Sequence, residues 1–310
     1  MSSIDAPTGP QNLLRGVSLI LISVFVISVQ DVIFKLFSTQ LTLWQIFAVR
    51  GMLALVLLFA LATMQGNQRN VLLGALNAWV LARSMFMTIA LMAFYAALPF
   101  LSLSTAGAAN YIAPIFVTVL SAWVILEPVG RLGWVGVCIG FAGALVLLQP
   151  GGDAFSLWVL SPLMGAGFYA LAHVTTRSKC LTVPVAAMAF SLSLVMMCAG
   201  LVVSGVLLLW QAPATLALPY PYIFGTWATV GVFEWAVLAM LAVFSVVIAA
   251  TSAGAYQAAP PAKIATFEYC YLIFVVLWDY LFFATTASGA TLLGMGMIVI
   301  AGMMVLRRRS

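Results

Sequence analysis

Charge is what this 310-residue sequence has least of. Asp, Glu, Lys and Arg together make up 6% of the residues, whereas hydrophobic residues make up 65%. A water-soluble domain carries about 25% charged residues, so the polar residues here are too few to cover a soluble globule, and a lipid bilayer is the solvent that fits. A transmembrane barrel is disfavoured as well, because its strands alternate polar and apolar residues, whereas the apolar runs 53–61 and 238–250 are continuous.

The residues that build common enzyme sites are scarce too. The chain has one histidine, His173, and four cysteines whose spacing matches neither a metal site nor a disulfide framework. The motifs HExxH and GxSxG and the phosphate-binding P-loop do not occur. We therefore expect no catalytic residue, no metal, no cofactor and no enzymatic activity.

Long apolar segments separated by turn-forming residues dominate the chain. A helix needs about 20 residues to cross a bilayer, and Pro- and Gly-containing breaks divide the sequence into segments of that size. The sequence therefore predicts an all-α membrane protein with ten transmembrane helices, preceded by a polar cytoplasmic tail at 1–13. The first apolar stretch, which ends near Leu36, is too long for the core of a signal peptide, so we expect a retained first helix. The expected helices are 14–36, 43–63, 74–97, 101–125, 131–149, 156–177, 184–210, 229–257, 261–283 and 288–306.

Lys and Arg are distributed unevenly between the predicted loops. With the N-terminus inside, the cytoplasmic segments hold every basic residue that lies outside the spans, and the external segments hold none. This positive-inside bias requires an even number of spans and predicts cytoplasmic N- and C-termini in the inner membrane. Nucleic acid is not an expected partner, because the basic residues do not gather on one soluble face. The cytoplasmic basic residues are Arg15, Arg69, Arg131, Arg177, Lys179, Arg307, Arg308 and Arg309.

The two halves of the sequence resemble each other. Segment 126–147 is similar to the segment that ends at 301–306, and 31–35 is similar to 173–177, so that Asp31 matches His173 and Asn110 matches Glu268. Five helices per half is an odd number, so the second half enters the membrane from the opposite side. Such inverted repeats are typical of alternating-access transporters. We expect one repeat at 14–150, a second at 151–306 and a basic cytoplasmic tail at 307–310.

Motifs along nearly the whole chain resemble the EamA-type ten-helix carriers of the drug/metabolite transporter superfamily. The resemblance implies two EamA-like repeats, a central cavity and secondary transport of small metabolites. One departure is that Glu127 has no acidic counterpart in the second half, where the segment reads Phe283-Ala284-Thr285. The motifs are Gln30-Asp31 with Lys35, Trp44-Gln45 with Arg50, Arg83-Ser84, residues 108–114 and 126–128, Pro261-Ala262, and Phe267-Glu268-Tyr269.

Polar residues inside the spans are the candidate site. A charge at the bilayer centre costs about 3 kcal/mol, so such residues are expected to face a partner or a wet cavity. Carboxylates and histidine suit a coupling proton or cation, arginines suit carboxylate or phosphate, and aromatic rings suit organic cations or ring systems. The candidates for substrate binding are Asp31, Arg50, Arg83, Asn110, Tyr111, Tyr169, His173, Glu268 and Tyr269, of which Glu268, Asp31 and His173 are also the coupling-ion candidates.

Each candidate also has a structural interpretation. Asp31 could pair with Lys35, and Glu268 could form an ion pair with Arg83, Arg50 or Lys263. His173 could be an interhelical hydrogen-bond donor. Asp279 is expected near the outer end of its helix and hydrated. Further aromatic residues are read as interfacial or lipid-facing, namely Trp44, Phe86, Tyr95, Tyr271 and Trp278.

The residues favour a secondary transporter that moves a small organic metabolite, such as an amino acid or an S-adenosylmethionine-like compound. A riboflavin-like vitamin importer or a drug exporter is the alternative within this class. A receptor or channel is the alternative from another class, although no selectivity-filter sequence or ring of charges is present. The expected partners are the small-molecule substrate and the lipid bilayer. Gly133, Gly136, Gly140 and Gly143 on one face of helix 131–149 predict close helix packing and leave a homodimer open.

Overall fold

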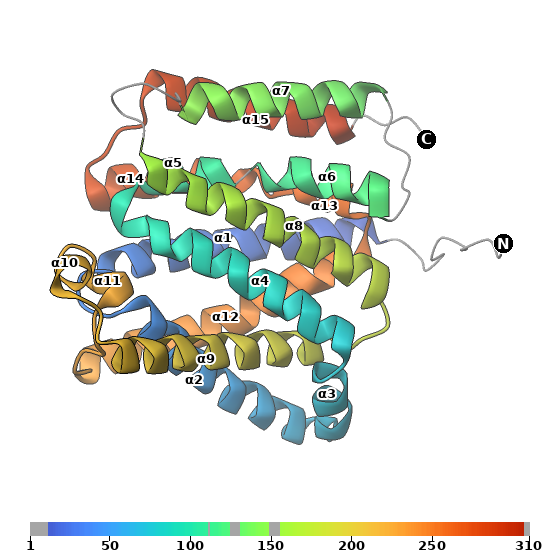
Figure 1. Ribbon diagram of the computed structural model, residues 1–310. Coiled ribbons are helices and arrows are strands. Elements are labelled where there is room, and N and C mark those ends of the chain that lie inside the picture. The colour runs from blue at the N-terminus through green and yellow to red at the C-terminus, as the bar shows by residue number, and fades with distance from the viewer. Residues whose placement is uncertain (1–11, 111, 125–130, 149–155, 307–310) are drawn as a thin grey trace.

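A computed structural model describes residues 12–110, 112–124, 131–148 and 156–306, and these residues form helices without a strand (Figure 1). Two 3₁₀ turns, Leu98–Phe100 and Leu157–Val159, precede α5 and α8. The helices are α1 Leu13–Phe37, α2 Leu43–Met64, α3 Gln68–Ala75, α4 Ala78–Ala97, α5 Leu103–Asn110, α6 Ala113–Val124, α7 Arg131–Leu148, α8 Leu160–Lys179, α9 Val185–Trp210, α10 Ala214–Ala217, α11 Pro221–Phe224, α12 Val232–Ala258, α13 Pro261–Phe267, α14 Cys270–Phe283 and α15 Gly289–Leu306.

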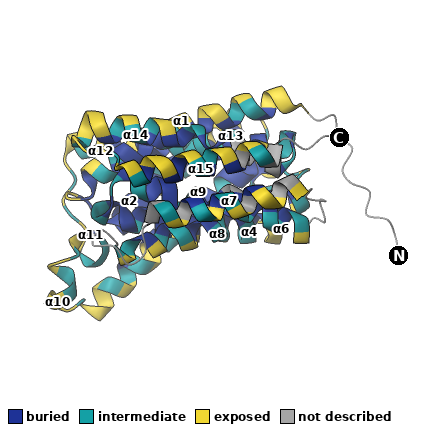
Figure 2. Ribbon diagram, turned by 90° about the horizontal axis from the view of Figure 1, so that it is seen from above, coloured by how far each residue is buried: buried dark blue, intermediate teal, exposed yellow. Residues whose placement is uncertain are grey.

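Much of the described chain has the length and apolarity of membrane spans. The outward faces carry exposed large hydrophobic residues such as Val202, Leu209 and Ile273 (Figure 2), which is the surface that a bilayer covers. Shorter apolar helices occur at Trp134–Gly143, Cys270–Phe283 and Gly289–Ala301. Among the described residues, seven helical stretches are long and apolar enough to cross a membrane: Leu13–Phe37, Leu43–Met64, Ala78–Phe100, Leu103–Val124, Leu157–Lys179, Val185–Trp210 and Val232–Ala258.

Most helices lie within a few residues of the predicted ranges, with two kinds of difference. The helix expected at 74–97 begins later, because the side chain of Asn77 accepts a hydrogen bond from Trp79 N and so caps α4, while α3 is a separate short helix. The helices expected at 101–125 and 261–283 are each broken, between α5 and α6 and between α13 and α14. The breaks follow Asn110 and Phe267, so they fall at matching positions of the two sequence halves.

Helices of the first half pack against helices of the second half. Figure 1 shows α7 and α15 side by side at one edge of the molecule, with α2, α3 and α9 at the opposite edge. The α10 end of the bundle holds α10, α11 and the first residues of α5, whereas the α3 end holds α3, the start of α1 and the end of α15. Pairs across the halves include α7 with α15, α2 with α9, α4 with α8, α1 with α12, α6 with α8, α5 with α14, and α6 with α13.

Glycines allow the closest of these approaches. A Cβ atom on Gly200 of α9 would lie 2.6 Å from the backbone nitrogen of Ala48 in α2, and one on Gly143 of α7 would lie 2.7 Å from Met297 Cβ in α15. Real Cβ atoms do not come so near to other atoms, so only glycine fits at these crossings. The close packing predicted for the glycine face of 131–149 is therefore present between α7 and α15, and the homodimer stays a prediction.

Candidate functional site

A cavity lies between the helices, and residues of both sequence halves line it. Cavities between the helices of a bundle are common places for small-molecule binding sites. The polar lining residues come from α1, α2, α4, α5, α8, α12 and the α13–α14 break. Six of the predicted site residues line the cavity, namely Asp31, Arg50, Arg83, Asn110, Tyr169 and Glu268.

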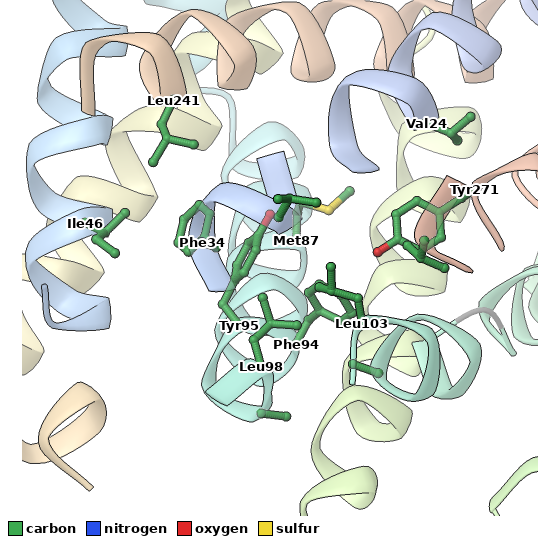
Figure 3. Packing of buried hydrophobic residues seen from close by; sticks show 14 of the residues in the cluster. Val24, Phe34, Ile46, Met87, Phe94, Tyr95, Leu98, Leu103, Leu241 and Tyr271 are labelled. Atoms are coloured by element: carbon green, nitrogen blue, oxygen red, sulfur yellow. The ribbon is translucent and has the colours of Figure 1, made fainter. Parts of the chain in front are cut away.

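Asp31 is 1% exposed and is held by two tyrosine hydroxyls. Tyr95 of α4 donates to Asp31 Oδ1 at 2.9 Å, and Tyr271 of α14 donates to Asp31 Oδ2 at 2.5 Å. Gln30 in turn donates its side-chain amide to the Tyr95 hydroxyl at 2.6 Å. Figure 3 shows the hydroxyl groups of Tyr95 and Tyr271 turned toward each other from opposite sides. The Asp31 cluster, which consists of Asp31, Gln30, Tyr95 and Tyr271, thus joins α1, α4 and α14.

Glu268 has a matching arrangement at the break between α13 and α14. It is 2% exposed, and its Oε1 atom accepts hydrogen bonds from Tyr169 of α8 at 2.9 Å and from Tyr256 of α12 at 2.8 Å. Within the described residues no ion pair joins Glu268 to Arg83, Arg50 or Lys263, and Lys263 is exposed. The Glu268 cluster, made of Glu268, Tyr169 and Tyr256, is therefore held by hydroxyl groups and not by countercharge.

His173 is fully buried behind this cluster and does not line the cavity. Its ring stacks on Tyr256 with centroids 3.9 Å apart and meets Tyr169 edge-on at 4.2 Å. Neither ring nitrogen has a hydrogen-bond partner. His173 therefore supports the two tyrosines that hold Glu268 and does not reach the cavity itself.

Two further predicted residues are not among the described lining residues. Tyr269 is buried next to Glu268 and lies outside the lining set. Tyr111 lies outside the residues that the structure describes, as does Glu127.

Arg50 is buried under aromatic rings. Its guanidinium lies 5.0 Å from the ring centre of Phe34, 5.4 Å from Phe47 and 6.0 Å from Tyr95. The ring faces carry partial negative charge that attracts the cation. Arg50 also donates to the sulfur of Met196 at 3.4 Å.

Arg83 is buried in the wall that α4 and α8 form. It is 1% exposed, and its Nε atom donates to Thr176 Oγ1 at 3.2 Å. Asn110, at the end of α5, completes the set of predicted polar residues in the lining.

Sequence reasoning misjudged several residues of the site. Tyr95 and Tyr271 were expected at the interface or facing lipid, and both are buried and line the cavity. Tyr271 follows Glu268 by three residues, so helical spacing was the available signal. Tyr256 was not singled out, and no feature of the sequence marks it.

The α10 end of the bundle is closed by hydrogen bonds. Lys35 donates to the backbone oxygens of Leu98 and Leu101 and not to Asp31, so its predicted pairing with Asp31 is wrong. Asp279 is 2% exposed, and its carboxylate accepts from the backbone nitrogens of Leu103 at 3.1 Å and Ser104 at 2.7 Å. The expectation that Asp279 is hydrated is therefore wrong, because the residue caps the start of α5.

The connection between α9 and α12 folds over the same end. Trp44 Nε1 donates to the backbone oxygen of Ile223 at 2.6 Å. The side-chain amide of Gln45 donates to Ala228 O at 2.8 Å and accepts from Ala228 N at 3.0 Å. This connection also buries Tyr222.

Part of the chain is similar to a family of known transporters. Residues 14–149 match the EamA-like transporter family. A riboflavin transporter of Vibrio cholerae serotype O1 is 40% identical over 57 residues, a stretch that spans only 18% of this chain and 19% of that relative. A solved crystal structure superposes with a TM-score of 0.63 at 18% identity, covering 97% of this chain and 100% of the other, which shows a shared fold. Residues 14–149 of this multi-pass membrane protein are thus similar to the EamA-like transporter family.

Proposed function

We propose that the chain is a secondary transporter that moves a small organic metabolite across the inner membrane by alternating access. Two five-helix repeats, 14–150 and 151–306, rock against each other around the cavity. Glu268 and Asp31 bind the coupling proton or cation, and the remaining lining residues hold the substrate. The protein needs no cofactor and catalyses no chemical reaction.

The pairing of helices supports the two-repeat arrangement. When the five spans of each half are exchanged in order, α1 corresponds to α8 and α4 to α12. The contact of α4 with α8 then becomes the contact of α12 with α1, which is also present. In the same way the contact of α5 with α14 becomes that of α13 with α6, and the contact of α5 with α7 becomes that of α13 with α15. Two repeats related by a two-fold axis produce such a pattern.

Charge placement supports the proposed orientation. The start of α1, the whole of α3 and the end of α8 lie toward the α3 end of the bundle (Figure 1), and these segments hold Arg15, Arg69, Arg177 and Lys179. Lys and Arg in short loops favour the cytoplasmic side. We therefore assign the α3 end, and with it both termini, to the cytoplasm.

The observation that carries the proposal is the cavity with two buried carboxyl groups, each held by tyrosines from other helices. Glu268 lies at the break between α13 and α14, and Tyr271 in the first turn of α14 reaches Asp31. The break therefore links both clusters. Broken helices at a cavity leave polar groups that can rearrange during transport, so a change of charge at either carboxyl would alter how the break is held.

An amino acid or an S-adenosylmethionine-like compound fits a cavity that combines acids, arginines and aromatic rings. A riboflavin-like substrate is the second candidate, because the partly matching relative is a riboflavin transporter and Phe94, Tyr95 and Tyr271 offer ring surfaces. An isoalloxazine ring would stack on such surfaces.

The test is flux in liposomes that hold the purified protein, measured for a panel of labelled metabolites with and without a pH gradient. We expect gradient-driven flux of one compound class, and we expect Glu268→Gln and Asp31→Asn to lose the gradient dependence. Glu234→Gln is the matched control, because Glu234 lies in the first turn of α12 outside the cavity lining. Flux that is independent of the pH gradient in the wild type and in every variant would support a carrier but contradict the coupling role of Glu268 and Asp31. Saturable binding without flux of any compound would favour a receptor, and flux that does not saturate would favour a channel.

A further inference from the structure

Arg83 is a buried cation without an acidic partner in the described part of the chain. The titratable groups that interact with it are Tyr169, His173 and Cys180, and none of these is acidic at neutral pH. Its hydrogen bond to Thr176 occupies Nε, while Nη1 is buried without any hydrogen-bond partner. A buried charge is costly unless it is paired and hydrogen-bonded, so the free protein holds Arg83 in an unsatisfied state.

The other buried arginine is better accommodated. Three aromatic rings surround Arg50, and Asp31 attracts it across the Asp31 cluster. Both arginines line the same cavity, but they differ in how the surrounding residues offset their charge. Arg50 also has one buried donor, Nε, without a hydrogen-bond partner, but the aromatic rings and Asp31 offset its charge. Among the described residues, no ring face or carboxylate offsets the charge of Arg83 in this way.

We infer that Arg83 is an anion subsite, and that the transported molecule carries a carboxylate or phosphate group that pairs with its guanidinium. The inference rests on the proposed transport function and specifies the substrate class. The guanidinium offers several N–H donors in a planar fork, which matches a carboxylate or phosphate in a two-point contact. Thr176, which donates its own hydroxyl to Ala172 O, holds Nε and so orients the fork.

The cavity has room for more than the acidic group. Its lining follows α4 from Arg83 to Tyr95, a distance of about 18 Å at 1.5 Å per helical residue. Phe94 and Tyr95 lie at the far end of this wall. An organic acid with its charged group at Arg83 can therefore place a ring or chain against these aromatic residues.

The experiment measures binding by the full-length protein in lipid nanodiscs, using matched pairs of an acid and its neutral analogue. The pairs are aromatic amino acids with their amides, aromatic carboxylates with their methyl esters, and flavin mononucleotide with riboflavin. We expect at least one acid to bind about 10- to 100-fold more tightly than its neutral analogue. A preference confined to the flavin pair identifies phosphate, and one confined to the other pairs identifies carboxylate.

Variants assign the preference to Arg83. Arg83→Gln should abolish it, Arg83→Lys should retain part of it, and Arg69→Gln, which changes an exposed arginine on α3, should leave it unchanged. Without ligand, Arg83→Gln should unfold at the same temperature as the wild type or higher, because it removes an uncompensated charge. A lowered unfolding temperature would instead indicate a structural partner for Arg83 and contradict the inference.

The outcomes separate this inference from transport itself. Equal binding of acids and neutral analogues, no binding of any acid, or an acid preference that survives in Arg83→Gln would overturn the anion subsite. If one of these results is found together with flux of a neutral compound, the proposed transport function still holds and only the anion subsite is refuted. Acid binding that depends on Arg83, in a protein that gives no flux, would uphold the subsite and refute transport.

Discussion

Tyrosine hydroxyls hold the buried acids of this protein. Tyr95 and Tyr271 bind Asp31, while Tyr169 and Tyr256 bind Glu268. A hydroxyl can donate to a carboxylate or accept from a carboxylic acid, whereas a guanidinium can only donate. Each cluster can therefore accommodate the charged and the neutral form of its acid, which suits groups that gain and lose a proton during a transport cycle.

Tyr95→Phe tests how much one hydroxyl contributes. The substitution removes the hydrogen bond to Asp31 and leaves the Gln30 amide without its acceptor. We expect the free energy of unfolding to fall by about 1–3 kcal/mol, the cost of leaving buried polar groups unpaired. Denaturant titration of the protein in detergent measures this. Tyr280→Phe, on a residue that is 65% exposed, should change stability by less than about 0.5 kcal/mol, and equal effects of both substitutions would contradict the assignment.

At the scale of helices, contacts between the halves depend on where glycine is placed. Gly200 of α9 faces Trp44 and Ala48 of α2 at distances that allow no side chain, whereas Gly205 of the same helix has no neighbouring atom within 4 Å of a built Cβ. The two glycines therefore have different roles although they lie about one and a half turns apart. One sets the distance between α9 and α2, and the other makes no such contact.

The same substitution at both positions should have opposite effects. Gly200→Ala should destabilise the protein by about 1–3 kcal/mol, because overpacking forces the backbones of α2 and α9 apart. Gly205→Ala should stabilise it by up to about 1 kcal/mol, because alanine loses less conformational freedom in a helix. Thermal unfolding in one detergent compares the two. A stabilising Gly200→Ala would show that this crossing is not tight.

The features of the fold and the site that could be predicted from the sequence are those that depend on neighbouring residues, whereas contacts between distant helices could not be predicted. Apolar segments and intramembrane charges are local signals, so most helix positions and the polar lining residues, Asp31 and Glu268 among them, were predictable. The break after Phe267 was not predicted, because no proline lies near it within the expected helix. Tyr95 was misjudged because an aromatic residue near a helix end has the same sequence signature whether it faces lipid or a carboxylate on another helix.

For the whole molecule, the arrangement of the two ends implies an orientation in the membrane. The connection 211–231 lies at the α10 end, and α3 lies at the other (Figure 1). With the α3 end in the cytoplasm, these segments face opposite compartments. The proposed topology therefore makes a prediction about intact cells.

Single cysteines in a cysteine-free background test that orientation. Thr215→Cys and Asn70→Cys place exposed thiols on α10 and α3, respectively. A membrane-impermeant maleimide should label Thr215→Cys in intact spheroplasts and Asn70→Cys only after the membrane is permeabilised. The reverse labelling pattern would invert the topology, and labelling of both in intact spheroplasts would contradict an odd number of spans between the two positions.

The cap that Asp279 provides for α5 has no equivalent in the other half. The carboxylate of Asp279, in the second half, binds the first backbone nitrogens of a first-half helix, and the residue that matches it in the first half is Ser121, whose buried hydroxyl has no hydrogen-bond partner. In alternating access the two ends of the bundle open in turn. Opening the α10 end would then break the Asp279 cap, whereas opening the α3 end would break no equivalent cap. If the protein works by the proposed alternating access, its two resting orientations would then differ in free energy, and the one that keeps this cap, open to the cytoplasm, would be the more populated.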